Sequence, residues 1–62
     1  MAMETWKALT DRVVEAEVRG AWRRYRVGTA HSDGVQLKAL GALRGIRVPY
    51  MEITALRVLQ KD

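Results

Sequence analysis

The sequence predicts a mainly β (all-β) domain, a strongly bent five-stranded small barrel that begins with a short helix. Apolar and polar residues alternate with a period of two along much of the chain, which places the apolar side chains on one face of each strand. Glycine and proline turn signals separate these runs at spacings of about eight to twelve residues. A flat sheet of 62 residues would leave one apolar face in water, so we expect the sheet to curl around a single core.

The first element is expected to be a short helix over residues 4–10. Met3, Trp6 and Leu9 recur at three- to four-residue spacing, which gives a helix one apolar face. Trp6 has the largest side chain on that face. We therefore expect Trp6 to dock the helix over one open end of the sheet as part of the core.

Two strands follow, at about 12–19 and 22–32, joined by a turn at Gly20-Ala21. β-Branched residues alternate with charged ones in these segments, which is typical of strands. Gly28 lies inside the second strand, where glycine marks a bulge or a bend that lets one long strand belong to both halves of a barrel. The side chains predicted to face the core from these strands are those of Val14, Ala16, Val18, Tyr25, Val27 and Thr29.

A hairpin turn is predicted at Asp33-Gly34, because a type I′ turn needs positive φ at both central residues and these two residue types tolerate it. The third strand then covers about 35–40, a short fourth strand 46–48, and a fifth strand 54–59. The side chains predicted to face the core from these strands are those of Val35, Leu37, Ala39, Ile46, Val48, Leu56 and Val58.

This order of a short helix and five bent strands resembles the Sm-like family. The segments that carry the resemblance are Trp6–Leu9 as the entry helix, Val14–Val18 as the first strand, Gly20 with Tyr25–Gly28 as part of the first Sm motif, and Val48–Ile53 as the turn before the last strand. The resemblance runs from about Trp6 to Leu59 and implies an Sm-like barrel with RNA as its ligand class. The broader group of SH3-like barrels fits the spacing about as well.

Two features depart from the Sm-like pattern. The family commonly carries an Asp and then an Asn in the loop after the second strand, whereas Asp33 is followed by Gly34 and the chain contains no Asn. The Arg-Gly pair of the second Sm motif would have to be Arg44-Gly45, which precedes the fourth strand. The family's RNA pocket is therefore not carried over to this chain.

Basic residues concentrate in the second part of the chain, since residues 1–21 carry a net charge of −1 and residues 22–62 a net charge of +5. Such an excess favours a polyanionic partner, and we expect nucleic acid, with RNA preferred over DNA. The outward strand positions predicted to bind nucleic acid are Arg24, Arg26, Lys38 and Arg47, and Arg57 also faces outward. Trp22 lies beside them and is the candidate for base stacking. The alternative is that these side chains form only a solvated outer face.

Four apolar residues have no evident place in so small a core, namely Leu40, Leu43, Met51 and Leu59. Exposed apolar groups often mark an interface, and the fourth and fifth strands are natural sheet edges, so we expect these residues to line the interface of a homo-oligomer. A second functional hypothesis is a protein-interaction module, such as a small adaptor or inhibitor. It would hold a protein partner through an edge strand with Leu43, Met51 and Trp22.

No catalytic, cofactor or metal site is predicted, and we expect that the protein is not an enzyme. His31, Ser32 and Asp33 adjoin at a hairpin tip, whereas triad members converge from separate elements in a sheltered pocket. The chain has one His and no Cys, which excludes a thiolate metal site and a disulfide. It has no apolar run of about 18 residues. We therefore expect no membrane partner and a cytoplasmic location, with which the absence of Cys is compatible.

Overall fold

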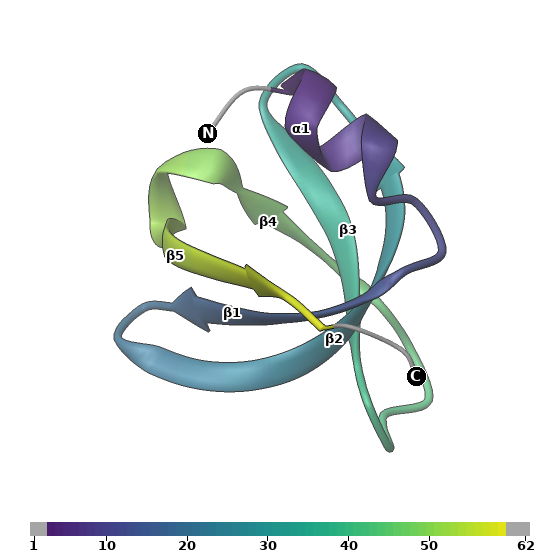
Figure 1. Cartoon of the computed structure of the whole chain (residues 1–62), viewed down its shortest axis with the longest axis vertical. Helices are drawn as coiled ribbons and strands as arrows, with labels where there is room; N and C mark the ends of the chain where they lie inside the picture. The colour runs from purple at the N-terminus through teal and green to yellow at the C-terminus, as the bar shows by residue number, and fades with distance from the viewer. Residues whose placement is uncertain (1–2, 60–62) are drawn as a thin grey trace.

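The computed structural model describes residues 3–59, which form one bent antiparallel sheet with a helix at its start (Figure 1). The elements in chain order are α1 (Met3–Ala8), β1 (Val13–Val18), β2 (Ala21–Ala30), β3 (Gly34–Ala39), β4 (Ile46–Pro49), the 3₁₀ turn η1 (Tyr50–Glu52) and β5 (Ile53–Val58). The predicted mainly β class, the helix and the five strands are confirmed. Each predicted boundary lies within two residues of the observed one.

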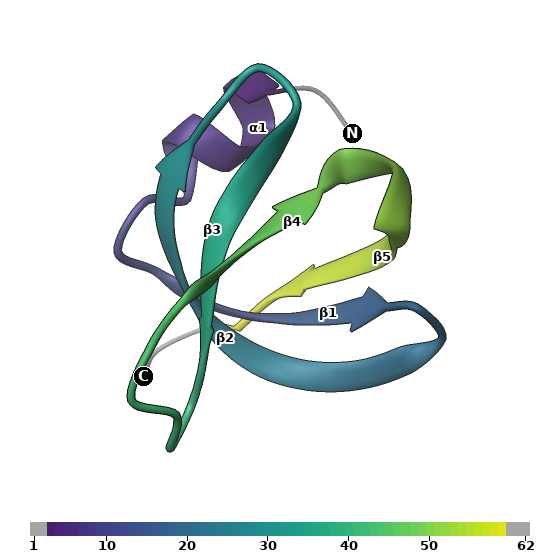
Figure 2. The same ribbon diagram turned by 180° about the vertical axis from the view of Figure 1, so that it is seen from behind.

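The strands lie side by side in the order β4-β3-β2-β1-β5, and each pairs antiparallel with its neighbours. The sheet curls so strongly that β4 and β5 approach the same side of the molecule, as the front and back views agree (Figures 1 and 2). These two strands are nevertheless the edges of the sheet and do not pair with each other in the described residues. The sheet is therefore a curled layer with two free edges.

A tight turn joins β1 to β2 at Arg19 and Gly20. Both residues have positive φ, 51° for Arg19 and 82° for Gly20, and Val18 pairs directly with Ala21. Positive φ at both central residues is what a type I′ turn requires. Arg19 adopts this conformation despite its side chain. The backbone N–H of Arg19 donates a hydrogen bond of 3.1 Å to the carbonyl oxygen of Glu52 and its Nε donates one of 2.8 Å to the Glu52 carboxylate.

The prediction of a type I′ turn at Asp33-Gly34 is wrong, although the β2–β3 hairpin itself is present. Neither residue has positive φ, and the loop is closed by a hydrogen bond of 2.7 Å from the N–H of His31 to the carbonyl oxygen of Gly34. Gly34 instead begins β3, where a Cβ atom would lie 2.5 Å from the carbonyl oxygen of Val48. Glycine is needed here because β4 packs directly against it.

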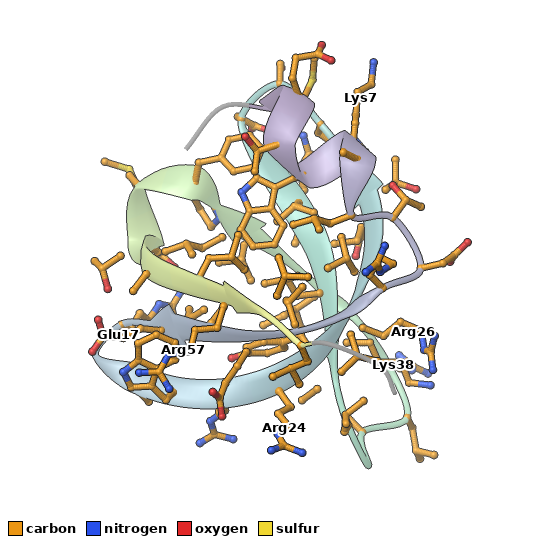
Figure 3. The ribbon with its side chains drawn as sticks, viewed as in Figure 1. Lys7, Glu17, Arg24, Arg26, Lys38 and Arg57 are labelled. Atoms are coloured by element: carbon orange, nitrogen blue, oxygen red, sulfur yellow. The ribbon has the colours of Figure 1, made fainter. Side chains whose placement is uncertain are left out.

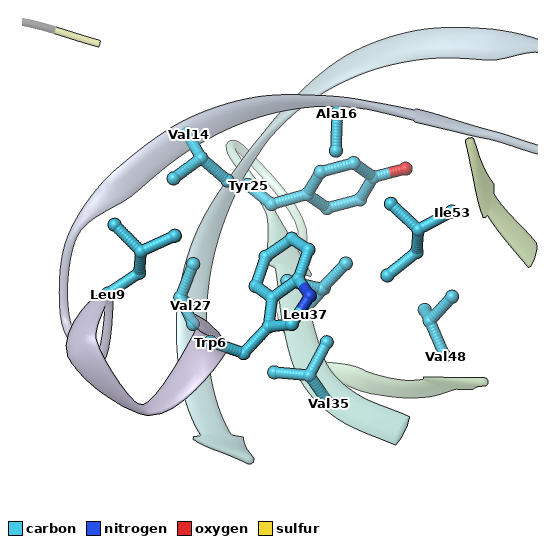
Figure 4. Packing of buried hydrophobic residues seen from close by; sticks show 10 residues of the cluster. All are labelled: Trp6, Leu9, Val14, Ala16, Tyr25, Val27, Val35, Leu37, Val48 and Ile53. Atoms are coloured by element: carbon cyan, nitrogen blue, oxygen red, sulfur yellow. The ribbon is translucent and has the colours of Figure 1, made fainter. Parts of the chain in front are cut away.

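The core lies inside the curl and is closed at one end by α1, whose Trp6 is fully buried. Figure 4 shows the indole between the side chains of β2, β3 and β4. The buried residues are Trp6, Leu9, Val14, Ala16, Tyr25, Val27, Val35, Leu37, Val48 and Ile53, and Val18, Ala30, Ala39, Tyr50 and Leu56 pack against them. The predicted core positions of Trp6 and Tyr25 are confirmed.

Three predicted core positions are wrong. Ile46 pairs with Leu37 and so lies on the core side of the register, but it is 61% exposed because no element covers that end of the sheet. Val58 is likewise exposed on the edge strand β5. Thr29 is exposed because the register shifts between Val27 and Ala30, so Ala30 takes the inward place. That shift is the irregularity predicted at Gly28.

Candidate nucleic-acid interface

The strand register brings the predicted basic residues to one face of the sheet. Arg26 and Lys38 are direct cross-strand partners, Arg24 lies two residues before Arg26, and Arg47 pairs with Gln36, which lies two residues before Lys38. Residues two apart in a strand share a face. We call this face, defined by Arg24, Arg26, Lys38 and Arg47, the outer basic face. Figure 3 shows Arg26 and Lys38 next to each other and Arg24 further along the curve.

Glu15 places a carboxylate between two of the outward arginines. It pairs in register with Arg24 on one side and with Arg57 on the other. Its Oε2 lies 3.9 Å from Nε of Arg24 and its Oε1 lies 3.5 Å from Nη1 of Arg57. The two arginines therefore share one negative charge, which lowers the net positive charge of this end of the face.

Arg47 also has an acidic partner, Asp33 in the β2–β3 loop. Nη2 of Arg47 donates a hydrogen bond of 2.5 Å to Oδ1 of Asp33. This hydrogen bond is the largest of the effects that hold the pKa of Asp33 below its ordinary value. Both side chains are accessible to solvent, so the pair reduces the charge available at Arg47 without burying it.

Arg26 and Lys38 differ from the other cations of the outer basic face. Within residues 3–59 neither side chain forms an ion pair. Nη1 of Arg26 donates a hydrogen bond of 3.1 Å to the backbone carbonyl oxygen of Asp11, which orients the guanidinium and leaves its charge uncompensated. The strongest unneutralised positive charge on this face therefore lies at one cross-strand pair.

A hollow with a volume of about 240 Å³ adjoins that pair. It exists because two outward positions next to Lys38 and Gln36 are glycines, Gly28 on β2 and Gly45 before β4. The residues that line the hollow are Asp11, Arg26, Val27, Gly28, Gln36, Leu37, Lys38 and Gly45. Sequence analysis identified Gly28 as a bend but gave no indication of a hollow. The hollow also needs Gly45, which lies beside β3 only because β4 pairs with β3.

Trp22 lies on the same face, opposite Glu17, and is 42% exposed. The guanidinium carbon of Arg57 is 4.8 Å from the centroid of the indole ring, within the range of cation–π contacts. Arg57 therefore occupies part of the aromatic surface that was predicted to stack on bases, while part of the Trp22 side chain stays accessible to solvent.

A second cavity, of about 360 Å³, opens at the uncovered end of the sheet. Its walls are mainly apolar, and the residues that line it are Val18, Arg19, Ala21, Arg23, Tyr25, Ala39 and Ile46. This apolar surface was missed by sequence analysis, which assigned Ile46 to the closed core. The alternation of residues predicts that Ile46 lies on the core side of β4. It does not predict whether another element covers Ile46 there, and within residues 3–59 none does.

The four residues predicted to line an oligomer interface do not form one patch. Leu43 in the β3–β4 loop is 95% exposed and Met51 in η1 is 87% exposed, but these segments lie at opposite ends of the molecule (Figure 1). Leu40 is 52% exposed and Leu59 is half-buried. An interface between copies that included both Leu43 and Met51 would therefore use two separate surfaces of each chain.

His31, Ser32 and Asp33 form a loop that is held by Tyr50. The Tyr50 hydroxyl donates a hydrogen bond of 2.6 Å to the carbonyl oxygen of His31. The backbone N–H of Tyr50 donates a hydrogen bond of 3.2 Å to the carbonyl oxygen of Asp33. Burial raises the pKa of the Tyr50 hydroxyl, which stays protonated and able to donate. Because the Asp33 carboxylate is engaged by Arg47, these three residues are positioned as a structural loop.

No protein-family model matches the sequence, and comparison with curated proteins and with solved structures gave no match either. The resemblance to the Sm-like and SH3-like barrels therefore stays a prediction. Within residues 3–59 no group of three His, Asp or Glu side chains is arranged to hold a metal ion. The same part of the chain contains no helix with the length and apolar character needed to cross a membrane.

Proposed function

We propose that this protein binds nucleic acid through the outer basic face, with RNA preferred over DNA. The observation that carries the proposal is the cross-strand pair Arg26–Lys38, which has no acidic partner in the described residues. Two uncompensated cations side by side attract successive phosphates and release the counterions bound to them. Trp22 and its exposed ring surface then offer a stacking platform to unpaired bases, as is common in RNA recognition.

The contributions of the four cations differ in this proposal. Arg26 and Lys38 supply most of the electrostatic attraction, because Arg24 shares Glu15 with Arg57 and Arg47 is paired with Asp33. Arg24 continues the positive surface toward Trp22, two residues away on the same strand. A bound strand would therefore run along β2, from Arg26 toward Trp22.

The experiment is a titration of labelled single-stranded RNA by fluorescence anisotropy at several salt concentrations. Lys38→Gln should weaken binding about fivefold or more and reduce the slope of log affinity against log salt by about 0.7, the value for one lost phosphate contact on a single strand. Lys7→Gln is the matched control, because it removes the same charge from an exposed position on α1, away from the outer basic face (Figure 3).

Two results would overturn the proposal. One is the absence of salt-dependent binding by the wild-type protein to RNA and to DNA. The other is an equal loss of affinity in Lys38→Gln and Lys7→Gln, which would show that only net charge matters. A wild-type preference for single-stranded DNA over RNA of the same sequence would overturn the choice of RNA alone.

Self-association is the second part of this proposal. A sheet edge with unpaired N–H and C=O groups tends to pair with another chain, and β4 and β5 are two such edges. Exposed Leu43 precedes β4, and exposed Met51 follows it in η1, so apolar groups lie beyond both ends of this edge strand, where a neighbouring copy could contact them. Sedimentation should therefore show an oligomer, and a monomer at high micromolar concentration would contradict it.

A protein-interaction module is the second candidate function. The cavity at the open end of the sheet favours it, because an apolar concave surface next to a free β4 edge suits an extended partner segment. Exposed Leu43, Met51 and Trp22 would extend that contact. Capture of a protein partner that resists nuclease and moderate salt, together with no RNA binding, would favour this candidate over the first.

A further inference from the structure

The hollow beside Arg26 and Lys38 is a consequence of two adjacent rows of outward side chains. One row runs Arg26, Lys38, Gly45, since Lys38 pairs with Arg26 and Gly45 lies beside it. The next row runs Gly28, Gln36, Arg47. A side chain is missing from each row, at Gly28 and at Gly45, so the backbone forms the floor and the neighbouring side chains form the walls.

The chemistry of the walls is mixed. Arg26 and Lys38 donate hydrogen bonds and carry positive charge, whereas the Gln36 amide both donates and accepts. Asp11 also lines the hollow, where its backbone carbonyl oxygen accepts a hydrogen bond from Arg26. This set of groups suits a ligand part that has both donors and acceptors.

The size of the hollow also bears on its occupant. The hollow is open to solvent and has a volume of about 240 Å³, which gives room for a group larger than a phosphate. A phosphodiester group has acceptors only, so it would leave the Gln36 side-chain oxygen, which lies beside Gly45, without a donor. A nucleobase is larger and has an edge with both N–H donors and acceptors, which matches the donor and acceptor of the Gln36 amide.

We propose that this hollow is the subsite for one unpaired nucleotide. The base lies on the backbone of Gly28 and Gly45, and Arg26 and Lys38 bind the phosphates on either side of it. The inference rests on the proposed nucleic-acid binding and adds to it a requirement for single strands. A base in a duplex is stacked and paired, so it enters such a hollow only after being flipped out at a cost in free energy.

The test is a substitution whose side chain fills the hollow without changing the charge of the residues that line it. A Cβ atom at Gly45 would lie 3.4 Å from the carbonyl oxygen of Leu37 and 3.6 Å from Cβ of Lys38, which are ordinary contacts. Gly45→Val should therefore keep the fold while its side chain occupies the site. Ala21→Val is the control, because Ala21 is exposed and does not line this hollow. Circular dichroism checks that both variants are folded.

Wild-type protein should bind a single-stranded oligonucleotide at least tenfold more tightly than a duplex of the same sequence. Gly45→Val should lose about tenfold for the single strand and change little for the duplex, whereas Ala21→Val should match the wild type. Should Gly45→Val prove unfolded, Gly45→Ala takes its place. Equal binding of the single strand by wild type and the folded Gly45 variant would overturn the subsite and leave the proposed function intact. No binding by the wild type would instead overturn the proposed function.

A second measurement separates a base site from a phosphate site. In amide ¹H–¹⁵N spectra, a nucleoside 5′-monophosphate should shift the resonances of Gly28 and Gly45, and inorganic phosphate at the same concentration should not. The same shifts with phosphate alone would overturn the inference, because the hollow would then be an anion site.

Discussion

The guanidinium of Arg57 in β5 stacks over the indole of Trp22 in β2, 4.8 Å from the ring centroid, although β1 lies between the two strands. Arg57 pairs in register with Glu15, and Trp22 pairs with Glu17, so the side chain of Arg57 reaches diagonally across β1. This contact ties an edge strand to the middle of the sheet. It also orients an exposed aromatic ring at one end of the outer basic face.

Replacement of Trp22 by alanine should lower the affinity for a single-stranded oligonucleotide about tenfold. Stacking of a base on an aromatic side chain contributes about 1–3 kcal/mol, and Trp22 provides that surface on this face. The side chain is not part of the buried core, so the melting temperature should fall only slightly. Fluorescence anisotropy and circular dichroism measure the two effects.

The control for this substitution is Trp22→Phe, which keeps an aromatic face and should retain most of the affinity. An alanine variant that binds as tightly as the wild type would show that the ring has no role in binding. In that case the contact with Arg57 would serve the fold alone.

Asp33→Asn should strengthen the binding of nucleic acid severalfold. The Asp33 carboxylate holds Arg47, and its removal frees a cation on the same face as Arg26 and Lys38. An asparagine at this position would still suit the loop, since Asp33 has an ordinary φ there. Glu4→Gln is the control for the same change in net charge at an exposed position on α1. An equal gain in both variants would contradict a specific role for the Asp33–Arg47 pair.

The same pair predicts a pH dependence of stability. The hydrogen bond from Arg47 lowers the pKa of Asp33 in the folded state. Its contribution is therefore fully present above the ordinary Asp pKa of about 3.9 and is lost as the pH falls through the lowered value. The wild type should therefore melt at a higher temperature than Asp33→Asn at pH 7, and this difference should disappear as the pH falls through the lowered pKa of Asp33. A difference that grows on acidification would contradict the assignment.

The alternation of residues was sufficient to predict which side of the sheet each basic residue would occupy. Arg24, Arg26, Lys38 and Arg47 share a face because a period of two fixes the side of each residue once the strands are known. The acidic side chains that pair with Arg24 and Arg47 were not predictable from this alternation. Asp33 reaches Arg47 only because β3 and β4 pair in one particular register.

Contacts between distant segments explain a further difference between expectation and structure, the position of the type I′ turn. Asp33-Gly34 has the favoured residues for a type I′ turn, yet the turn with two positive φ angles lies at Arg19-Gly20. The hydrogen bonds from Arg19 to Glu52 hold that turn, and they join segments 33 residues apart. Local residue preference is outweighed here by contacts between distant parts of the chain.

Gly34→Ala should destabilise the fold by about 1–3 kcal/mol, because its Cβ would lie 2.5 Å from the carbonyl oxygen of Val48 and β4 would have to move. Gly45→Ala is the matched control, since its Cβ meets only ordinary contacts at 3.4 Å or more. Urea unfolding monitored by circular dichroism measures both. Equal stability of the two variants would contradict the close packing of β3 against β4 at this position.

Trp6→Ala should leave the protein largely unfolded at room temperature. The indole is fully buried at the centre of the core, and removal of so large a side chain costs about 3–5 kcal/mol, close to the whole stability expected of a domain this small. Trp6→Phe should cost clearly less, because Nε1 of Trp6 has no hydrogen-bond partner within residues 3–59 and phenylalanine removes that unpaired donor together with part of the ring. Chemical denaturation of the two variants, followed by far-ultraviolet circular dichroism, gives the comparison. A phenylalanine variant as unstable as the alanine variant would contradict this account, because it would show that the aromatic ring that phenylalanine retains adds nothing to the core.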